Sequence, residues 1–346
     1  MRAMARLAVG LAALVAVGCG DNHPTTASTD APSVDSPVDG GNPLEPDTLA
    51  GTGLCMDAKC LQISPDVVEY TPTFPLWSDS ATKRRWVYLP PGTTIDTSDM
   101  DHWQFPEGTK FWKEFTRDGV RVETRYIAKV GPGTSTRDWF FVSYGWNASQ
   151  DATTQVVFGQ QNANGTQHDI PSRMDCKTCH EALAPSRILG FQAVQLDGAS
   201  PVGIDELAQM SVLSAPPSGS SPHFPVPGNA TEKAALGYLH VNCGHCHNPL
   251  SPIHDMTPME LRLETGSMAT PADTAVYKTA VDHVAAIPFD EDNHHYGTIV
   301  ISNDPDNSAM IARMSSMTPM RHMPNLGSEV VDPDGQTTLR AWINGL

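Results

Sequence analysis

The stretches "RMDCKTCHE" (residues 173–181) and "VNCGHCHNP" (residues 241–249) repeat one pattern, Cys-x-x-Cys-His. Its two cysteines and its histidine stand at positions i, i+3 and i+4, which share one face of a helical turn. Two thiols and one imidazole can therefore meet a single group. Four of the seven cysteines of the chain lie in these two motifs.

This spacing suits covalent c-type haem, which needs two thiols for its vinyl groups and an imidazole for one face of its iron. Cys-x-x-Cys-His is the known signature of that attachment. We therefore expect two covalently bound haem c groups. The residues that attach and ligate them are Cys176, Cys179 and His180 for the first, and Cys243, Cys246 and His247 for the second.

Zinc and redox-active thiols are the alternatives. The two cysteine pairs lie further apart than those of zinc ribbons or fingers, and a four-thiolate zinc site would leave His180 and His247 without a role. A thioredoxin-type motif belongs to a βαβ context, which the flanking sequence lacks. Haem is the interpretation that accounts for both histidines.

The N-terminus has the character of a targeting segment. Arg2 and Arg6 precede an apolar run too short to cross a bilayer, and the run ends in small residues before Cys19. We expect residues 1–18 to be a lipoprotein signal peptide, with an ordinary secretory signal as the alternative. Residues 19–50 are predicted to be a disordered tether.

Export follows from either signal. Lipid on Cys19 would anchor the protein to a bilayer, at the periplasmic side of the cell envelope or at the outer membrane. The net charge of the 346 residues is −17. Such an acidic chain disfavours nucleic acid and favours a redox partner protein with a basic surface.

Cys55 and Cys60 remain once lipid and haem are assigned. No histidine follows Cys60, so this pair does not form a third haem motif. In an exported protein, two leftover cysteines so close in sequence are most simply a disulfide.

Residues 51–185 are predicted to form a small antiparallel β domain that ends in the first motif. Stretches such as "KFWKEFTRDG" and "VRVETRYIAKVG" are rich in aromatic and β-branched residues and end in turn signals. Residues 186–228 are rich in proline and serine and are expected to be a connector.

No sixth ligand is evident for the iron of the first motif. Met174 is too close to Cys176 to reach the far face of a haem, and His168, Met210 and His240 are candidates without support. A five-coordinate iron, which can bind small molecules, is therefore one of the alternatives.

Residues 229–346 are predicted to form an all-α domain, so that the whole chain is α+β. Asn229 or Thr231 can cap a first helix, and Pro333 can open a last one. The pair Gly237 and Tyr238 on the first helix resembles class I cytochromes c, in which such residues pack against an aromatic of the last helix. The segment 281–298 is expected to be an inserted loop.

The same resemblance places a methionine before a proline and shortly before the last helix. Met323 stands there and is the expected sixth ligand of the second iron, with Met320 second and His322 third. The other methionines of this region are expected to pack around an apolar cofactor.

Several stretches together resemble a family of largely uncharacterised bacterial diheme c-type cytochromes, from about Tyr70 to the C-terminus. They are "TFPLWSDSATKRRWVYLPPG", "FPEGTKFWKEF", "ETRYIAKV", "CKTCH", "YLHVNCGHCHNP", "NDPDNSAMIARM" and "MPNLGSEVVDPDGQTTLRAWI". The resemblance implies two c-type haems and export, but no substrate. The Cys55 and Cys60 pair lies outside this pattern.

The run "FPEGTKFWKEF…YIAKV…DWFFVSYGW…CKTCH" is also similar to β-type cytochromes c′ and their hydroxylamine-oxidising relatives. Some of these carry a lysine cross-linked to haem, and Lys129 is the nearest position. An exposed strand residue is the more ordinary interpretation of Lys129.

Three functions are consistent with these features. The first is a diheme c-type cytochrome lipoprotein that transfers electrons at the bacterial cell envelope. The second is a haem enzyme, either peroxidase-like or acting on a small nitrogen compound, that uses an open first haem. The third is a lipoprotein that senses or binds a ligand without catalysis. The sequence offers no catalytic triad, phosphate loop or carboxylate pair for other chemistry.

Overall fold

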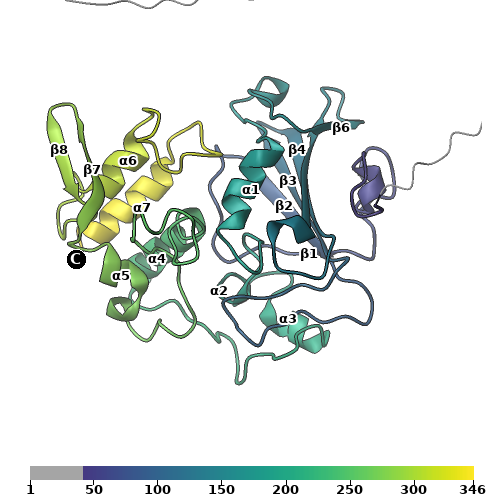
Figure 1. The fold of residues 1–346 in the computed structure, drawn as a ribbon, viewed down its shortest axis with the longest axis horizontal. Helices are drawn as coiled ribbons and strands as arrows, with labels where there is room; N and C mark the ends of the chain where they lie inside the picture. Colours follow the sequence, from purple (N-terminus) through teal and green to yellow (C-terminus); the bar gives the residue numbers. More distant parts are fainter. Residues whose placement is uncertain (1–41) are drawn as a thin grey trace, which may run out of the picture. The chain divides into compact units, whose positions relative to one another are not determined.

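One antiparallel sheet of six strands dominates the structure, with the strands in their sequence order from β1 to β6 (Figure 1). The computed structural model describes residues 42–346. The strands are β1 (Val68–Glu69), β2 (Thr82–Tyr88), β3 (Lys110–Arg117), β4 (Val120–Lys129), β5 (Trp139–Trp146) and β6 (Thr153–Val156). The sheet thus occupies the region whose aromatic and β-branched segments predict strands.

The β3–β4 hairpin sets the register at the centre of the sheet. Asp118 and Gly119 connect the strands, and both have positive φ, 51° and 80°. A two-residue turn of this kind matches the twist of paired strands and favours Asp-Gly. As a consequence Lys113 lies directly opposite Arg125 across the hairpin.

One face of the sheet is covered by the N-terminal part of the described chain. Trp112 and Tyr126 are buried on this face together with Leu49 and Leu54. The Tyr126 hydroxyl donates a hydrogen bond to the Leu44 carbonyl, at 3.1 Å. The packed part of the chain therefore begins before residue 51, so the tether predicted over residues 19–50 does not extend as far as residue 50.

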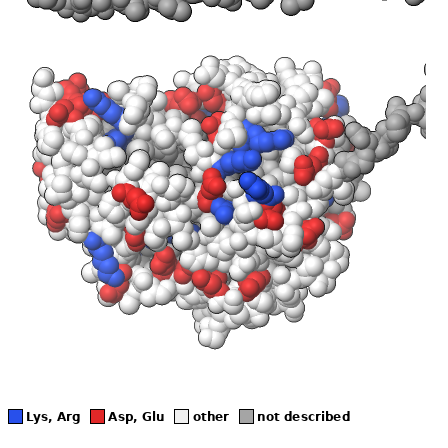
Figure 2. All heavy atoms as spheres, viewed as in Figure 1, with Lys and Arg blue, Asp and Glu red and all other residues white. Residues whose placement is uncertain are grey.

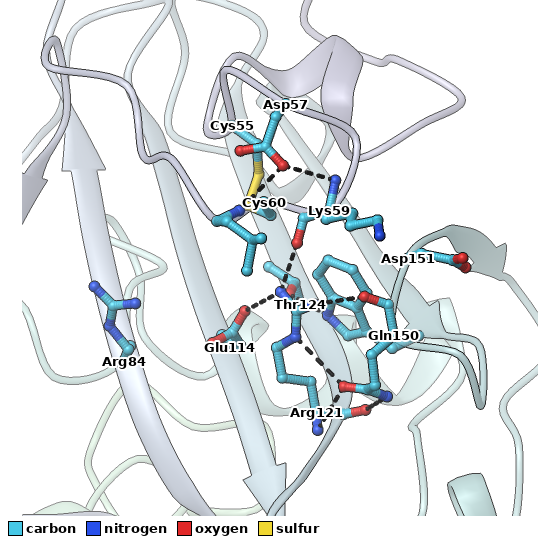
Figure 3. A network of polar contacts seen from close by, with 12 residues as sticks. Cys55, Asp57, Lys59, Cys60, Arg84, Glu114, Arg121, Thr124, Gln150 and Asp151 are labelled. Carbon is cyan, nitrogen blue, oxygen red and sulfur yellow. Dashed lines mark hydrogen bonds and ion pairs between the residues drawn. A yellow bond between two sulfur atoms is a disulfide. The ribbon is translucent and has the colours of Figure 1, made fainter.

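A disulfide joins Cys55 to Cys60 at the edge of this covering segment (Figure 3). Inside the loop, the Asp57 carboxylate accepts backbone hydrogen bonds, the shortest from Gln62 at 2.7 Å. Arg121 on β4 donates to the Lys59 carbonyl at 2.9 Å. The small loop is thereby tied to the sheet.

The opposite face of the sheet packs against Tyr70, the segment 89–105 and three helices. Phe111 of β3 contacts Phe191, with ring centroids 5.3 Å apart. The helices are α1 (Arg173–Glu181), α2 (Ala193–Leu196) and α3 (Ile204–Gln209). Residues 186–228, expected to be a connector, therefore supply part of this core, including Phe191 and Leu196.

The C-terminal region is not the all-α domain that the sequence predicted. Its elements are α4 (Ala230–Asn242), α5 (Ala275–Thr279), β7 (Val284–Glu291), β8 (His294–Thr298), α6 (Ala309–Ser315) and α7 (Pro333–Ile343). The segment expected to be an inserted loop is thus a β-hairpin (Figure 1). Asp292 and Asn293 have positive φ and form its two-residue turn, a signal that the helical interpretation overlooked.

Helices α4 and α7 pack together, but not through the contacts expected from class I cytochromes c. A Cβ added at Gly237 would lie 2.1 Å from the ring of Phe74, so this glycine faces the segment between β1 and β2. Tyr238 packs instead against Gly335 of α7, and its hydroxyl contacts the Asp332 carboxylate at 3.0 Å. Asp332 is also the N-cap of α7.

Residues 42–346 belong to one compact unit, in which the sheet and the C-terminal helices are joined. Within this part of the chain, no helix is both long and apolar enough to cross a membrane. The signal peptide expected over residues 1–18 and the lipid expected on Cys19 lie outside the described residues.

Candidate functional site

The first Cys-x-x-Cys-His motif lies within helix α1. Ser172 caps the helix by accepting from the Asp175 backbone N–H, and the Asp175 carboxylate accepts from the Ser172 backbone N–H in return. This reciprocal capping fixes where the helix begins. Cys176, Cys179 and His180 therefore share one helix face, and all three line the same cavity.

The cavity lies between α1, the sheet and two segments of the C-terminal region. The space between these elements is about 1080 Å³ when the part open to solvent is included. Phe111 and Phe141 line it from the sheet, and Asn242 and Leu326 line it from the C-terminal region. A flat apolar group attached to α1 would lie against aromatic rings on one side.

His180 is oriented as iron-ligating histidines usually are. Its Nδ1 donates to the Arg187 carbonyl at 2.5 Å, and its Nε2 has no partner within residues 42–346. A backbone carbonyl on one ring nitrogen commonly orients the other nitrogen toward a metal. Burial lowers the pKa of His180 to about 3, which keeps the ring in the neutral form that binds iron.

The second motif begins where helix α4 ends. Cys243 is the C-cap of α4, and the backbone N–H of His247 donates to the Cys243 carbonyl at 2.9 Å. The motif therefore forms a separate turn, rather than continuing the helix as the sequence suggested. The Asn248 side chain holds this turn by donating to the carbonyls of Gly244 and His245.

His247 is less firmly held than His180. Its Nδ1 is buried and has no hydrogen-bond partner in the described chain. Burial lowers the pKa of His247 to about 4, so this ring is also neutral. The two motifs thus share a signature and a protonation state but differ in how the histidine is supported.

The thiols do not have the properties of redox cysteines. All four are free. Burial raises the pKa of Cys176 to about 11 and the pKa values of Cys243 and Cys246 to about 12, whereas reactive thiols have lowered values. Within residues 42–346, no cluster of three or more His, Cys, Asp or Glu side chains could hold a metal ion. The geometry therefore favours neither the redox nor the four-thiolate zinc alternative.

The two motifs lie close to each other although the sequence assigned them to different domains. His245 of the second motif lines the same cavity as Cys176, Cys179 and His180 of the first. The second motif therefore faces the site formed by the first.

A row of cationic side chains crosses the sheet beside the first motif. Arg85, Lys113 and Arg125 occupy directly opposed positions on β2, β3 and β4. Arg125 has a counterion, because its guanidinium lies 2.6 Å from the Glu123 carboxylate. The side chains of Arg85 and Lys113 make no hydrogen bond or ion pair within the part of the chain that the structure describes.

This row fits the acidic side of a haem. Like charges directly opposite each other on a sheet are destabilising, and buried charges require partners. Lys113 and Arg125 line the cavity, and Arg85 is 5% exposed. The two carboxylates of a haem would supply the missing negative charge, and the free thiols and His180 would supply its attachment and its iron ligand.

The candidates for the second sixth ligand are not equivalent in the structure. Met320 is 92% exposed. His322 uses both ring nitrogens, Nδ1 with the Ser316 carbonyl at 2.6 Å and Nε2 with Ser328 at 2.9 Å. Met323 is half-buried. Met323 therefore stays the predicted ligand, and the other two candidates lose support.

The histidine candidates for the first sixth ligand have other partners. His168 contacts the Glu123 carboxylate at 2.7 Å. His240 accepts from the Leu263 backbone N–H at 3.0 Å and contacts the Gln192 amide at 2.6 Å.

Two methionines and one lysine were also considered from the sequence as residues that could contact the first haem. Met174 and Met210 are 69% and 49% exposed. Lys129 is buried rather than exposed, donates to the Gly133 carbonyl and lies 5.2 Å from the centre of the Trp139 ring. Lys129 is thus engaged away from the thiols of the first motif.

Sequence reasoning missed several residues of the site. Lys113, Arg125 and His245 line the cavity, and Arg262 is buried near the second motif with Nε and Nη1 unpartnered within residues 42–346. Lys113 could have been recognised from the sequence, because in "FWKEF" it takes an inward-facing strand position between two phenylalanines. His245 could not have been recognised, because the Cys-x-x-Cys-His motif accepts any residue at its position.

Compared with models of protein families, with curated proteins and with solved structures, the chain matches none of them. Its function is therefore inferred from the residues of the site.

Proposed function

We propose that this protein is an exported diheme c-type cytochrome that transfers electrons at the bacterial cell envelope. One haem c is attached to Cys176 and Cys179, and the other to Cys243 and Cys246. The observation that carries the proposal is the arrangement of the first motif. Its thiols and its histidine line one cavity, and the histidine is fixed through Nδ1 with Nε2 free.

The bound haems would supply one-electron chemistry, and the chain would hold and tune them. His180 and His247 would hold the irons, and Met323 would complete the second site. Phe111 and Phe141 are buried and form an apolar wall of the first site. The second motif reaches the cavity of the first through His245, which supports direct electron exchange between the two groups.

The charge of the surface supports a basic redox partner. Acidic side chains are scattered over the face shown in Figure 2, and basic ones gather in a few groups. With a net charge of −17, attraction to a basic protein speeds encounter at low ionic strength. Lipid on Cys19 would hold the protein at the membrane where such partners meet it.

A haem enzyme with an open first iron is the second candidate. The observation that favours it is that His168, Met210 and His240, the sixth ligands considered from the sequence, are exposed or engaged elsewhere. Carbon monoxide separates the two candidates, because it binds an open ferrous haem and not a closed one.

The primary test is the haem content of the protein made in a host that matures c-type cytochromes. We expect two haems per chain, measured by pyridine haemochrome absorption and by intact mass after denaturation. A chain without covalent haem would refute the proposal. Mass analysis of the N-terminal peptide tests lipid on Cys19 independently.

A further inference from the structure

His245 belongs to the second motif in sequence but to the first site in space. It lies between Cys243 and Cys246, yet its side chain lines the cavity that contains Cys176, Cys179 and His180. It is 9% exposed. The residue that the attachment pattern treats as a spacer thus reaches across to the neighbouring motif.

The ring of His245 lacks the partners that a structural core histidine has. Its Nδ1 is buried and has no hydrogen-bond partner within residues 42–346. His240, one turn earlier on α4, shows the contrast, because both of its ring nitrogens are engaged. A buried polar group without a partner is costly, so an unfilled role for this ring is expected.

The position of the ring lets it meet a group held by the first motif. His245 lines the same cavity as His180 and Lys113. A neutral histidine keeps a lone pair on one of its two ring nitrogens, and that nitrogen can bind a metal.

Few other side chains around the cavity could bind iron opposite His180. The residues that line it include no methionine and no other histidine. Lys113 carries the one amine, and it belongs to the cationic row on the sheet, where a carboxylate would be its natural partner.

We infer that His245 is the sixth ligand of the iron that His180 binds. The inference rests on the proposed diheme function. The turn that attaches the second haem would then also close the first site and couple the two haems through one short segment. Two histidine ligands would give the first haem a lower potential than a haem with histidine and methionine ligands. Electrons would accordingly pass from the first haem to the second.

The test compares the full-length holoprotein with its His245→Ala and His245→Met variants. The His283→Ala variant is the control, because His283 is an exposed histidine outside the cavity. Intact mass establishes that each variant keeps two haems. Electron paramagnetic resonance reports the axial ligands of the oxidised haems, and carbon monoxide is titrated into the reduced protein.

We expect the wild type and His283→Ala to show one bis-histidine low-spin signal and to bind no carbon monoxide at the first haem. His245→Ala should lose that signal and gain one carbon monoxide per chain, and added imidazole should restore the six-coordinate spectrum. His245→Met should keep a six-coordinate iron with a raised potential.

Three results would overturn the inference. The first is carbon monoxide binding at the first haem of the wild type. The second is an unchanged resonance spectrum in His245→Ala, and the third is carbon monoxide binding at the first haem of Lys113→Met but not of His245→Ala. In each of these cases two covalent haems would still be present, and the diheme proposal would stand. Absence of covalent haem would end both.

Discussion

The two Cys-x-x-Cys-His motifs share a signature but have different surroundings. The first lies inside α1, and its histidine is anchored to the Arg187 carbonyl beside a cationic row. The second follows the end of α4, and the Nδ1 of His247 has no partner within residues 42–346. The signature specifies how a haem is attached, whereas the surroundings decide its axial ligands, its counterions and its potential.

The comparison also shows that the motifs are not independent. His245 from the second motif lines the cavity of the first, together with Cys179 and His180. Two sites that the sequence assigned to separate domains lie within one compact unit. The following predictions test how far the two sites differ and how far they depend on each other.

The largest expected effect is the loss of one haem at a time. The double variant Cys176→Ala/Cys179→Ala should retain one covalent haem, and Cys243→Ala/Cys246→Ala should retain the other. Each double variant removes the thiols of one site only, so the intact mass of the protein should fall by the mass of one haem. Cys55→Ser/Cys60→Ser is the control and should keep both. Unchanged haem content in either variant of the motifs would contradict the assignment.

Met323→Ala should change the second haem and leave the first as it is. Loss of the thioether should remove the charge-transfer band that methionine-ligated ferric haem shows near the red edge of the spectrum, and should lower the potential of that haem. Met320→Ala is the matched control, because Met320 is 92% exposed. Persistence of the band in Met323→Ala would assign the ligand to another methionine.

Lys113→Met should have opposite effects with and without the first haem. In the holoprotein it removes the partner of a haem carboxylate, and the free energy of unfolding should fall by about 3–5 kcal/mol. In the Cys176→Ala/Cys179→Ala background it removes an amine that has no partner within residues 42–346 and whose pKa burial lowers well below its usual value, and the protein should become more stable. Denaturant unfolding measures both.

Arg84→Met is the control for Lys113→Met. Arg84 is on the same sheet but carries an exposed side chain paired with Glu69. Its replacement should cost less than about 1 kcal/mol in both backgrounds. The same sign for Lys113→Met in both backgrounds would exclude a carboxylate at this position.

Glu123 should make the sheet side of the first site sensitive to acid. Burial alone would raise its pKa, but Arg125 and His168 outweigh burial and lower the pKa of Glu123 from 4.5 to about 2. A carboxyl whose folded-state pKa is depressed stabilises the fold above its unfolded pKa, and that stability is lost as pH falls toward about 2.

Glu123→Gln should therefore lower stability at pH 7 by about 1–3 kcal/mol and flatten its decline between about pH 5 and pH 2. Chemical unfolding across this pH range is the measurement. Glu69→Gln, at an exposed carboxylate, is the control. An unchanged acid profile in Glu123→Gln would show that other carboxylates govern it.

The smallest effect on the two sites is expected from the disulfide, which belongs to neither motif. Reducing the Cys55–Cys60 disulfide, which closes a short loop, should cost about 2 kcal/mol of stability. The haem content and both potentials should stay unchanged, because the loop covers the other face of the sheet. A change in either potential would mean that the covering segment acts on the site through the sheet.

Part of the fold could be predicted because it depends on local patterns. Alternation in "KFWKEFTRDG" marks a strand, its Asp-Gly marks the turn, and Asp332-Pro333 marks the start of α7. The β7–β8 hairpin was missed because expectations for a helical domain outweighed the Asp292-Asn293 turn signal. The all-α interpretation failed for that reason.

The sequence by itself determined where each set of two thiols and one imidazole lies, since three residues at fixed spacing within a few positions are a local property. It also determined that Cys55 and Cys60 were the cysteines left to pair. Only the tertiary structure decided which side chains surround each motif. Register placed Lys113 beside Arg125, and chain packing placed His245 in the cavity of His180. Such contacts join residues far apart in sequence, and no local spacing encodes them.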